Sequence, residues 1–556
     1  MRSVFLLFTT FLFFTAAVLC AQPPARVQTG YDSIQPARLK ADLTFLSSDA
    51  LEGRLSLQRG SEIAIQWIAS EFAKAGLKPL VSDSYLQPVP LIEFSADRAL
   101  TSLTLARDGQ NEVFHAPDAT ATFAHEAAVS GRVVFAGFGI TAPELDYDDY
   151  AGIDARGKIV LVFNHEPQEA DPNSVFNGIS NTRYANNNYK LFNAERHGAV
   201  AVLTMPDPNH QGPARTAAPA PAGQTPAGQT PAGGRGGRGQ AQAAQRPRIL
   251  SESLAEGGPS IPLFTLGRRV SDSLFEAAGK KAAEVETAIN AKPAPASFDV
   301  PGVSIELRTA TSAQRRDNSY NVVGFIEGSD PALKAETIVF SGHFDHDGTG
   351  PAGIYHGADD NGSGTVGVVA LAHAFAANPV KPRRSLLFIV FAAEERGLLG
   401  SYYYVSHPLR PLATTRAQIN FDMIGRNEAP DPRVITTISS DTSNQLGLIG
   451  THYSPDYRET VERQNKTVGL DITSKWDLDA YNSVLFRSDQ YPFLLHDVPA
   501  IWWFTGFHPD YHQVTDTVEK INFEKMAKIV KLAYLSGFEF ADEQNPPRLE
   551  PRAKAK

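Results

Sequence analysis

The C-terminal half of the chain alternates short apolar runs with longer amphipathic stretches. Between about residues 304 and 541, the apolar runs are ETIVFSGHFDH, SLLFIVFAAEE, AQINFDMIG and PAIWWFTG. Helix-like stretches such as GTVGVVALAHAFAAN and INFEKMAKIVKLAYLSGF alternate with them. Continuous apolar runs are typical of strands that are buried on both faces. The pattern therefore predicts an α/β fold, with a mixed, largely parallel β-sheet and helices on both of its faces.

Two of the predicted helices carry end signals. The stretch SEIAIQWIASEFAKAGLKP has apolar residues at helical spacing, with Ser61 as its candidate N-cap and with Gly76 and Pro79 beyond its last turn. In the last helix, Asn522 is the candidate N-cap. Both segments are expected to pack an apolar face against the sheet.

The middle of the chain has a different pattern of apolar and polar residues. Between residues 96 and 295, short β-like runs (GRVVFAGFGI, GKIVLVFN, GAVAVLTM and SIPLFTLG) surround one helix-like stretch, NNNYKLFNAERHG. This pattern predicts a separate β-rich unit. Within it, residues 213–247 repeat PAGQT and contain almost no large apolar side chains. That segment cannot bury enough surface to offset its ordering entropy, so it is expected to be a disordered surface loop.

Composition and charge narrow the functional classes. The chain has 556 residues, which suits two or three domains, and its formal net charge is -10. A mildly acidic protein lacks the basic footprint of a nucleic-acid-binding protein, so no nucleic-acid partner is expected. The stretch GGRGGRG inside residues 213–247 is read as part of a tolerated loop insertion.

The first residues predict export. Residues 1–21 begin with one Arg, continue as an apolar run and end in small residues, as a signal peptide does. No other segment is long and apolar enough for a stable membrane span. The protein is therefore expected to be secreted or periplasmic. Cys20 is the only cysteine; a lipid anchor there is possible in principle, but Val18 and Leu19 make a poor lipoprotein signal.

Each apolar run of the C-terminal half ends in acidic residues or histidine. The residues concerned are His343, Asp345, Glu394, Glu395, Asp422, His508 and His512, with Asp359 and Asp360 in GADDNGSG. A sheet of this kind gathers its strand ends at one edge, and two histidines with several carboxylates suit zinc or a related divalent ion. Glu394 and Glu395 taken alone could be a charge pair at a helix start. Burying so many carboxylates without a cation would cost several kcal/mol for each.

These motifs resemble the co-catalytic zinc aminopeptidase family, which includes bacterial secreted leucine aminopeptidases and glutamate carboxypeptidase. The matching stretches are SGHFDHDG, GADDNGSG, FAAEERGLLGS, INFDMIG and YHQVTDT, with LSSDALEGR upstream and RSDQYPF before the last strand. The resemblance implies a zinc exopeptidase fold, in which residues 38–95 and 296–545 form a discontinuous catalytic domain. It also implies that residues 96–295 are an inserted protease-associated domain.

The resemblance implies a role for each matching residue. Five ligands would hold two zinc ions, with Asp360 as the bridge: His343, Asp360, Glu395, Asp422 and His512.

The catalytic residues are implied by the same resemblance. Glu394 would be the general base, and Asp345 would orient a ligand or tune the metals. Tyr511 would polarise the scissile carbonyl, and Arg487 would contact the substrate. Four further residues do not match ligand positions and are expected to be neighbours or rim residues: His346, His356, Asp359 and His508.

The expected activity is that of a zinc-dependent exopeptidase acting on peptides, specifically an aminopeptidase. Three alternatives stay open at this point: a carboxypeptidase of the glutamate carboxypeptidase type, a glutaminyl-cyclase-like acyltransferase with one zinc, and a non-catalytic binding protein. Side-chain preference depends on loops that form the pocket walls, so the sequence predicts neither it nor the oligomeric state.

Overall fold

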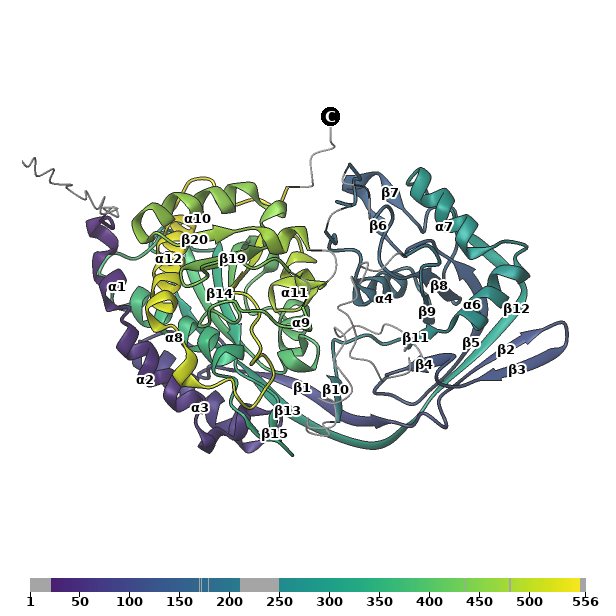
Figure 1. Cartoon of the computed structure of the whole chain (residues 1–556), viewed down its shortest axis with the longest axis horizontal. Coiled ribbons are helices and arrows are strands. Elements are labelled where there is room, and N and C mark those ends of the chain that lie inside the picture. The colour runs from purple at the N-terminus through teal and green to yellow at the C-terminus, as the bar shows by residue number, and fades with distance from the viewer. Residues whose placement is uncertain are drawn as a thin grey trace, which may run out of the picture.

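The structure is a computed structural model that describes residues 22–550, apart from residues 170, 172, 179, 211–249, 435 and 480–481. The predicted signal peptide, residues 1–21, and the predicted loop, residues 213–247, lie outside the described residues. Two units, each built on its own large sheet, lie side by side (Figure 1). No helix within the described part of the chain is both long and apolar enough to cross a membrane.

The first unit is built on a nine-stranded sheet with the order β10-β1-β13-β17-β14-β18-β21-β19-β20. Its strands are β1 (Leu86–Ala96), β10 (Ser251–Leu254), β13 (Thr311–Ile326), β14 (Thr337–His343), β17 (Ser385–Phe391), β18 (Thr415–Phe421), β19 (Gln445–Ile449), β20 (Asp471–Thr473) and β21 (Ala500–Phe504). The four central strands β17, β14, β18 and β21 are parallel, as are β19 and β20, and the other pairs are antiparallel. The predicted α/β fold with a mixed sheet is confirmed.

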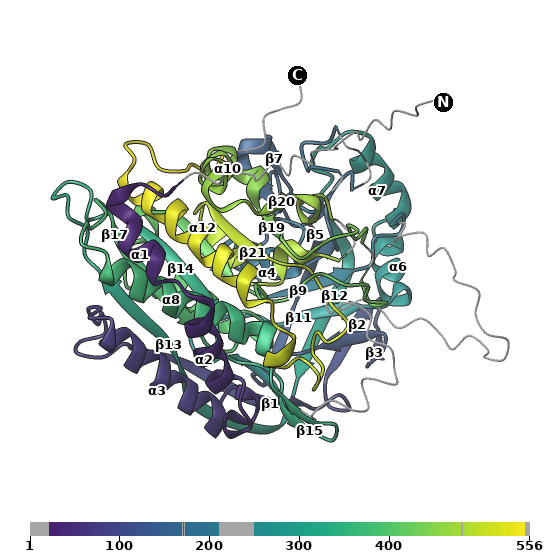
Figure 2. The same ribbon diagram turned by 60° about the vertical axis from the view of Figure 1, so that its left-hand side comes forward.

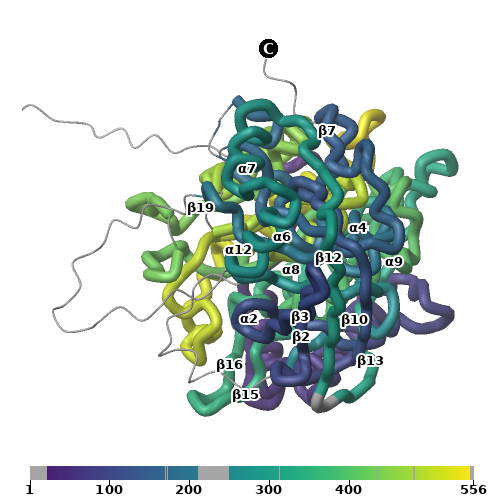
Figure 3. The backbone as a smooth tube through the Cα atoms, turned by 90° about the vertical axis from the view of Figure 1, so that its right-hand side faces the viewer, coloured from purple at the N-terminus to yellow at the C-terminus, as the bar shows by residue number. Residues whose placement is uncertain are grey.

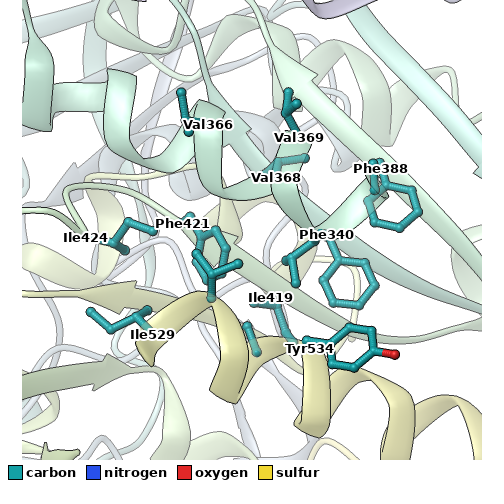
Figure 4. Packing of buried hydrophobic residues seen from close by; sticks show 14 of the residues in the cluster. Phe340, Val366, Val368, Val369, Phe388, Ile419, Phe421, Ile424, Ile529 and Tyr534 are labelled. Atoms are coloured by element: carbon teal, nitrogen blue, oxygen red, sulfur yellow. The ribbon is translucent and has the colours of Figure 1, made fainter. Parts of the chain in front are cut away.

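Helices cover both faces of this sheet. One face carries α1 (Gln28–Ser33), α2 (Pro36–Leu46), α3 (Arg59–Lys74), α8 (Gly364–Ala377), α10 (Pro455–Val468) and α12 (Phe523–Asp542), several of which stand in front of the sheet in Figure 2. The other face carries α9 (Leu399–Ser406) and α11 (Gln490–Leu494). Successive strand residues point to opposite faces, so Phe340 packs with Phe388 and Tyr534 in one cluster (Figure 4), whereas Val339 packs in the other.

The second unit is built on an eight-stranded sheet with the order β3-β2-β12-β5-β8-β9-β11-β4. Its strands are β2 (Ser102–Arg107), β3 (Gln110–Phe114), β4 (Ala119–Ala121), β5 (Ala127–Phe135), β8 (Ile159–Phe163), β9 (Ala201–Met205), β11 (Leu263–Leu266) and β12 (Phe298–Thr309). Helices α4 (Asn187–Arg196), α6 (Arg268–Ala277) and α7 (Ala282–Ala291) belong to this unit, which faces the viewer in Figure 3. Two small hairpins complete the strands: β6 (Thr141–Ala142) with β7 (Tyr147–Asp148), and β15 (Gly348–Gly350) with β16 (Gly353–Tyr355).

The units exchange strands at their boundary, which differs from the boundary expected at residues 96 and 295. Strand β12, residues 298–309, pairs with β2 and β5 of the second sheet, although the sequence analysis places it in the catalytic domain. Strand β10, residues 251–254, lies inside the predicted insert but pairs with β1 of the first sheet. Because β12 runs almost directly into β13, one extended ribbon joins the two sheets.

The two helix-start predictions have different outcomes. The Asn522 side chain accepts a hydrogen bond from the backbone N–H of Lys525, so the predicted cap of α12 is confirmed. The Ser61 cap is wrong, because α3 begins at Arg59 and the Ser61 hydroxyl donates to the backbone carbonyl of Gln58. Polar residues just inside a first turn mimic a cap in sequence, and only the backbone path separates the two cases.

Arg183 makes several polar contacts between the units. Its backbone N–H donates to the Tyr453 hydroxyl at 2.7 Å, and its guanidinium donates to the Leu494 carbonyl at 2.9 Å. The guanidinium also pairs with Asp497 at 2.7 Å and with Glu144 at 3.4 Å. This one side chain therefore links a loop of the second unit to α11 and its neighbours in the first.

Candidate metal centre

The carboxyl ends of the central parallel strands place the candidate ligands. His343 is the last residue of β14, and Asp422 directly follows β18. Glu394 and Glu395 begin a short 3-10 helix just after β17, and His512 lies in the loop after β21. Parallel neighbouring strands end at the same edge, so residues far apart in sequence meet there.

Three carboxylates surround the imidazole of His343. Its Nε2 lies 3.7 Å from Asp360 Oδ1, 3.6 Å from Glu394 Oε2 and 3.6 Å from Asp422 Oδ2. The Nε2 atom is buried and has no hydrogen-bond partner among the described residues. Ligand atoms about 2.1 Å from a tetrahedral zinc ion would lie about 3.4 Å apart, close to these spacings.

A second group of ligand atoms lies beside the first and shares Asp360. The Nε2 of His512 lies 3.1 Å from Asp360 Oδ2 and 3.5 Å from Glu395 Oε2. The two oxygens of Asp360 therefore face different histidines, as a carboxylate that bridges two ions would require.

The electrostatics of both groups fit cations. Burial, together with the neighbouring Glu395 and Asp422, raises the pKa of the Asp360 carboxyl well above its ordinary value. Burial likewise raises the pKa of Glu394. Burial works against the charged form of His343, but the facing Glu394 and Asp422 carboxylates raise its pKa overall. A cation at this place would take over the charge balance that a proton otherwise supplies.

The imidazole of His512 is already in the ligand form. Burial lowers its pKa to about 4, so the ring is neutral near pH 7 and has a lone pair to donate. Its other nitrogen, Nδ1, lies 2.8 Å from Asp347 Oδ2. A carboxylate behind a ligating histidine fixes the ring and raises its basicity.

The turn that carries the two glutamates is held by Asp345. Its Oδ1 accepts from the backbone N–H of Glu394 at 3.0 Å, and its Oδ2 accepts from that of Glu395 at 3.1 Å. Asp345 also lies next to His343, with its Oδ1 3.7 Å from the Nδ1 of that ring. The aspartate therefore sets the direction of both glutamates.

The GADDNGSG loop is fixed in the same way. The Asp516 carboxylate accepts from the backbone N–H groups of Asp359 at 3.0 Å and Asp360 at 3.1 Å. The Asn361 side chain donates to the carbonyl of Phe421, the last residue of β18, at 2.8 Å. These bonds tie the bridging carboxylate to the strand end that carries Asp422.

Arg54, in the LSSDALEGR stretch, donates hydrogen bonds to backbone carbonyls next to the candidate centre. The side chain is fully buried, and it donates to the carbonyls of Phe344 at 2.7 Å, His356 at 2.6 Å and Gly357 at 2.8 Å. Burial lowers its pKa to about 10, which still leaves it charged at neutral pH. The upstream motif therefore braces the two loops that carry His343 and Asp360.

Two of the four residues expected to be neighbours or rim residues prove to be structural. Asp359 and His508 are both buried and hydrogen-bonded to each other at 3.2 Å, and Asp359 Oδ1 accepts from the backbone N–H of Gly425 at 2.7 Å. His508 is thus part of the interior and not of the rim. His356 lies nearer the surface, 2.8 Å from Asp49.

His346, expected to be a neighbour or rim residue, lies beside the candidate ligands, with its Nδ1 2.8 Å from Glu395 Oε1. Two residues close to the candidate ligands were missed. Asp347 lies 2.8 Å from the Nδ1 of His512, and it belongs to HFDHDG, where several adjacent acids and histidines are a usable signal. Asp489, in RSDQYPF, is fully buried, and burial raises its pKa to about 7.

Tyr511 and Arg487 form one wall beside the centre. The Arg487 guanidinium donates to the Tyr511 hydroxyl at 3.3 Å and stacks over Phe507 at 5.1 Å. The Tyr511 ring meets the His512 ring edge-on, with centroids 4.1 Å apart. The structure therefore brings both predicted residues to the side of the second ligand group.

Comparison with known proteins finds a family match over part of the chain. Residues 321–535 match the model of Peptidase family M28. The probable leucine aminopeptidase 2 of Aspergillus oryzae is 31% identical over 206 residues, which is 37% of either chain. Leupeptin-inactivating enzyme 1 of Streptomyces exfoliatus is 28% identical over 226 residues, which is 40% of this chain and 43% of that protein. The chain thus spans less than half the length of these curated relatives.

Among solved structures, an aminopeptidase from Aneurinibacillus sp. strain AM-1 aligns with a TM-score of 0.44 at 18% identity, over 95% of this chain and 98% of that chain. The family match, in contrast, covers the part of the sequence in which the ligand cluster lies. Over residues 321–535, the chain is therefore similar to peptidase family M28.

Proposed function

We propose that the protein is an exported zinc-dependent aminopeptidase that hydrolyses the N-terminal residues of peptides. The observation that carries this proposal is the shared carboxylate of Asp360, whose two oxygens face His343 and His512. The family match and the relatives named leucine aminopeptidase support it. Export rests on the signal-peptide pattern of residues 1–21.

The chain's own residues would hold two zinc ions. His343 and Asp422 would bind one ion, Glu395 and His512 the other, and Asp360 would bridge them, with His346 close to the second. When bound, such a pair of ions lowers the pKa of a shared water and polarises the substrate carbonyl.

Glu394 is the proposed general base. It is the carboxylate of the first group that is not needed as a ligand, and Asp345 fixes its backbone. In this role its carboxylate accepts the proton of the attacking water and then delivers it to the leaving amine. Burial raises its pKa, which strengthens it as a proton carrier.

Tyr511 and Arg487 are proposed to position the substrate. The Tyr511 hydroxyl, held by Arg487, can donate toward the oxygen of the scissile carbonyl. Because Arg487 is engaged by Tyr511 and stacked on Phe507, it is a weak candidate for a free carboxylate-binding group. The relatives named leucine aminopeptidase likewise favour an aminopeptidase over a carboxypeptidase.

We further propose that the second unit is a protease-associated domain that shapes access to the centre. Its sheet is formed by residues 102–309, and its Arg183 anchors it beside α11 of the first unit. Its role in substrate selection is part of this proposal.

Metal analysis tests the proposal. The purified chain should hold two more zinc ions than a variant carrying His343→Ala and His512→Ala, and it should lose activity with a chelator and regain it with zinc. A difference of one ion, with pyroglutamate formed from N-terminal Gln, would identify a glutaminyl-cyclase-like enzyme instead. No difference in bound metal would indicate a non-catalytic protein.

A further inference from the structure

The second unit has its own cluster of metal-ligating side chains. His165, Glu169, Asp207 and His210 each offer one ligand atom, and these atoms all lie within 4.8 Å of one another. Each of the four belongs to the second unit, so none of them is shared with the centre described above. The cluster lies outside the segment that matches the peptidase family, residues 321–535.

The topology of the second sheet explains why these residues meet. Strands β8 and β9 are parallel neighbours, with Phe163 opposite Met205 at their carboxyl ends. His165 follows the end of β8 by two residues, and Asp207 follows the end of β9 by two. This is the edge at which α/β sheets bind ligands.

The side chains form two facing pairs. The Nδ1 of His165 lies 2.6 Å from Asp207 Oδ2, and the Nδ1 of His210 lies 2.6 Å from Glu169 Oε2. The two imidazole rings are stacked, with centroids 4.2 Å apart and planes 15° from parallel. Glu169 also approaches His165, at 3.9 Å.

A buried oxygen at this place points to a ligand. Asp207 is only 4% exposed, and its Oδ1 has no hydrogen-bond partner among the described residues. A buried carboxylate oxygen without a donor is costly, and a cation is the group that would satisfy it. The Lys190 ammonium is nearby, but it donates to the carbonyls of Phe163 and His165, both at 2.6 Å.

The alternative without a metal is a pair of histidine–carboxylate hydrogen bonds, in which each Nδ1–H donates to Asp207 or Glu169. That arrangement still leaves the buried Oδ1 of Asp207 without a donor in the part of the chain that the structure describes. A single dication would then balance Asp207 and Glu169.

We propose that His165, Glu169, Asp207 and His210 bind one divalent transition-metal ion, zinc or a close relative. Two imidazoles and two carboxylates form a borderline ligand set for such ions. Four protein ligands leave no open position in a tetrahedral site, so the ion is structural. It would fasten the ends of β8 and β9 to the loop that carries Glu169.

The test uses the full chain, in which His343→Ala and His512→Ala remove two candidate ligands of the first centre. On this background, zinc titration by calorimetry should show one remaining site. Adding His165→Gln and His210→Gln should weaken that site at least tenfold, since outer-shell changes alone cost about 10–100-fold. Adding His115→Gln and His125→Gln, two histidines of the same unit outside the cluster, should leave it unchanged.

Two further measurements distinguish loss of this metal site from loss of the fold or of the peptidase activity. Glu169→Gln changes a partly exposed ligand and should weaken zinc binding while the circular dichroism spectrum stays that of the parent. With the first centre intact, the His165→Gln, His210→Gln chain should lose one ion and keep its peptidase rate at saturating zinc. An equal zinc affinity with and without the cluster histidines, or no site on the His343→Ala, His512→Ala background, would overturn the proposal whether or not the chain is a peptidase.

Discussion

At the scale of single residues, the adjacent glutamates Glu394 and Glu395 face different partners. Glu394 Oε2 lies 3.6 Å from His343, whereas Glu395 contacts His346 at 2.8 Å and His512 at 3.5 Å. Asp345 holds the backbone of both, so the turn and not the sequence spacing sends them to opposite groups. A charge pair at a helix start would not explain these separate contacts.

The first prediction separates the two glutamates. Glu394→Gln should lower kcat by about 10²–10⁴-fold, the usual contribution of a general base, and should leave the zinc content unchanged. Kinetics and metal analysis of the same sample provide the check.

Glu395→Gln is the matched control for that prediction. It should lower zinc affinity, because it removes a charged ligand beside His512. A Glu394→Gln enzyme that turns over at the parent rate, or that loses zinc as Glu395→Gln does, would refute the assignment of roles.

The second prediction concerns Asp345, which acts through the glutamates. Asp345→Asn replaces one of the two accepting oxygens by an NH2 group, so the backbone N–H of Glu394 or of Glu395 would face a donor. We expect a loss of about 10–100-fold in kcat or in zinc affinity. Kinetics over a zinc titration separate the two effects, and an unchanged kcat at every zinc concentration would show that the turn does not need Asp345.

At this scale, the sequence predicts the positions of residues at strand ends, but not the directions of side chains that follow a backbone turn. His343, Glu395 and Asp422 lie at or just after strand ends, where the apolar runs already place them, whereas Asp360 and His512 lie in loops. His346 and Asp347 come after the strand, and their directions depend on a turn braced by Arg54 from a distant part of the chain. Asp489 could not be recognised because its burial depends on packing between elements.

At the scale of elements, the apolar runs correspond to the central strands, whereas short edge strands escape the pattern. Strand β10 has four residues and pairs with β1, more than a hundred residues earlier in the chain. Its pairing sets Glu252 directly opposite Glu93, and no periodicity in the sequence signals that contact. Helix α3 forms where the sequence predicts it, but Gln58 and not Ser61 is at its N-cap position.

The third prediction uses the strand β10. Burial raises the pKa of Glu252 from 4.5 to about 7. The folded chain therefore binds this proton more tightly than the unfolded chain, and the free energy of unfolding falls as the pH rises from about 4.5 to about 7. The full effect is on the order of 3 kcal/mol.

Glu252→Gln removes this titration. Relative to the parent, the variant should gain on the order of 3 kcal/mol of stability between pH 4.5 and pH 8, as measured by denaturant unfolding at several pH values. Other groups titrate equally in both proteins and cancel in the difference. A stability difference that does not change with pH would contradict the buried, proton-binding state of Glu252.

At the scale of the whole molecule, two sheets share one continuous ribbon. Strands β12 and β13 are separated by a single residue, Ala310, so the boundary between the units has no linker that composition could reveal. The change of sequence pattern near residue 295 therefore does not mark the boundary, because the second sheet continues to Thr309. The existence of a separate β-rich unit was predictable, but its strand exchange was not.

The fourth prediction concerns the contact between the units. Arg183→Met removes the bonds to Leu494 and Asp497 and should cost about 1–3 kcal/mol at that interface. Hydrogen exchange should speed up around Leu494 and Tyr184. Arg156→Met, which removes an exposed pair with Asp154 inside the second unit, is the control and should leave exchange at the interface unchanged. Equal exchange in both variants would mean that Arg183 does not hold the units together.

The central claim is that this centre cleaves peptides next to a free N-terminal amine. The most direct measurement compares the hydrolysis of an aminoacyl-anilide with that of its N-acetylated form in one zinc-loaded sample. We predict that only the free-amine substrate is cleaved and that chelation abolishes the reaction. Cleavage of N-acetylated substrate at a similar rate, or hydrolysis that persists after zinc is removed, would contradict the account.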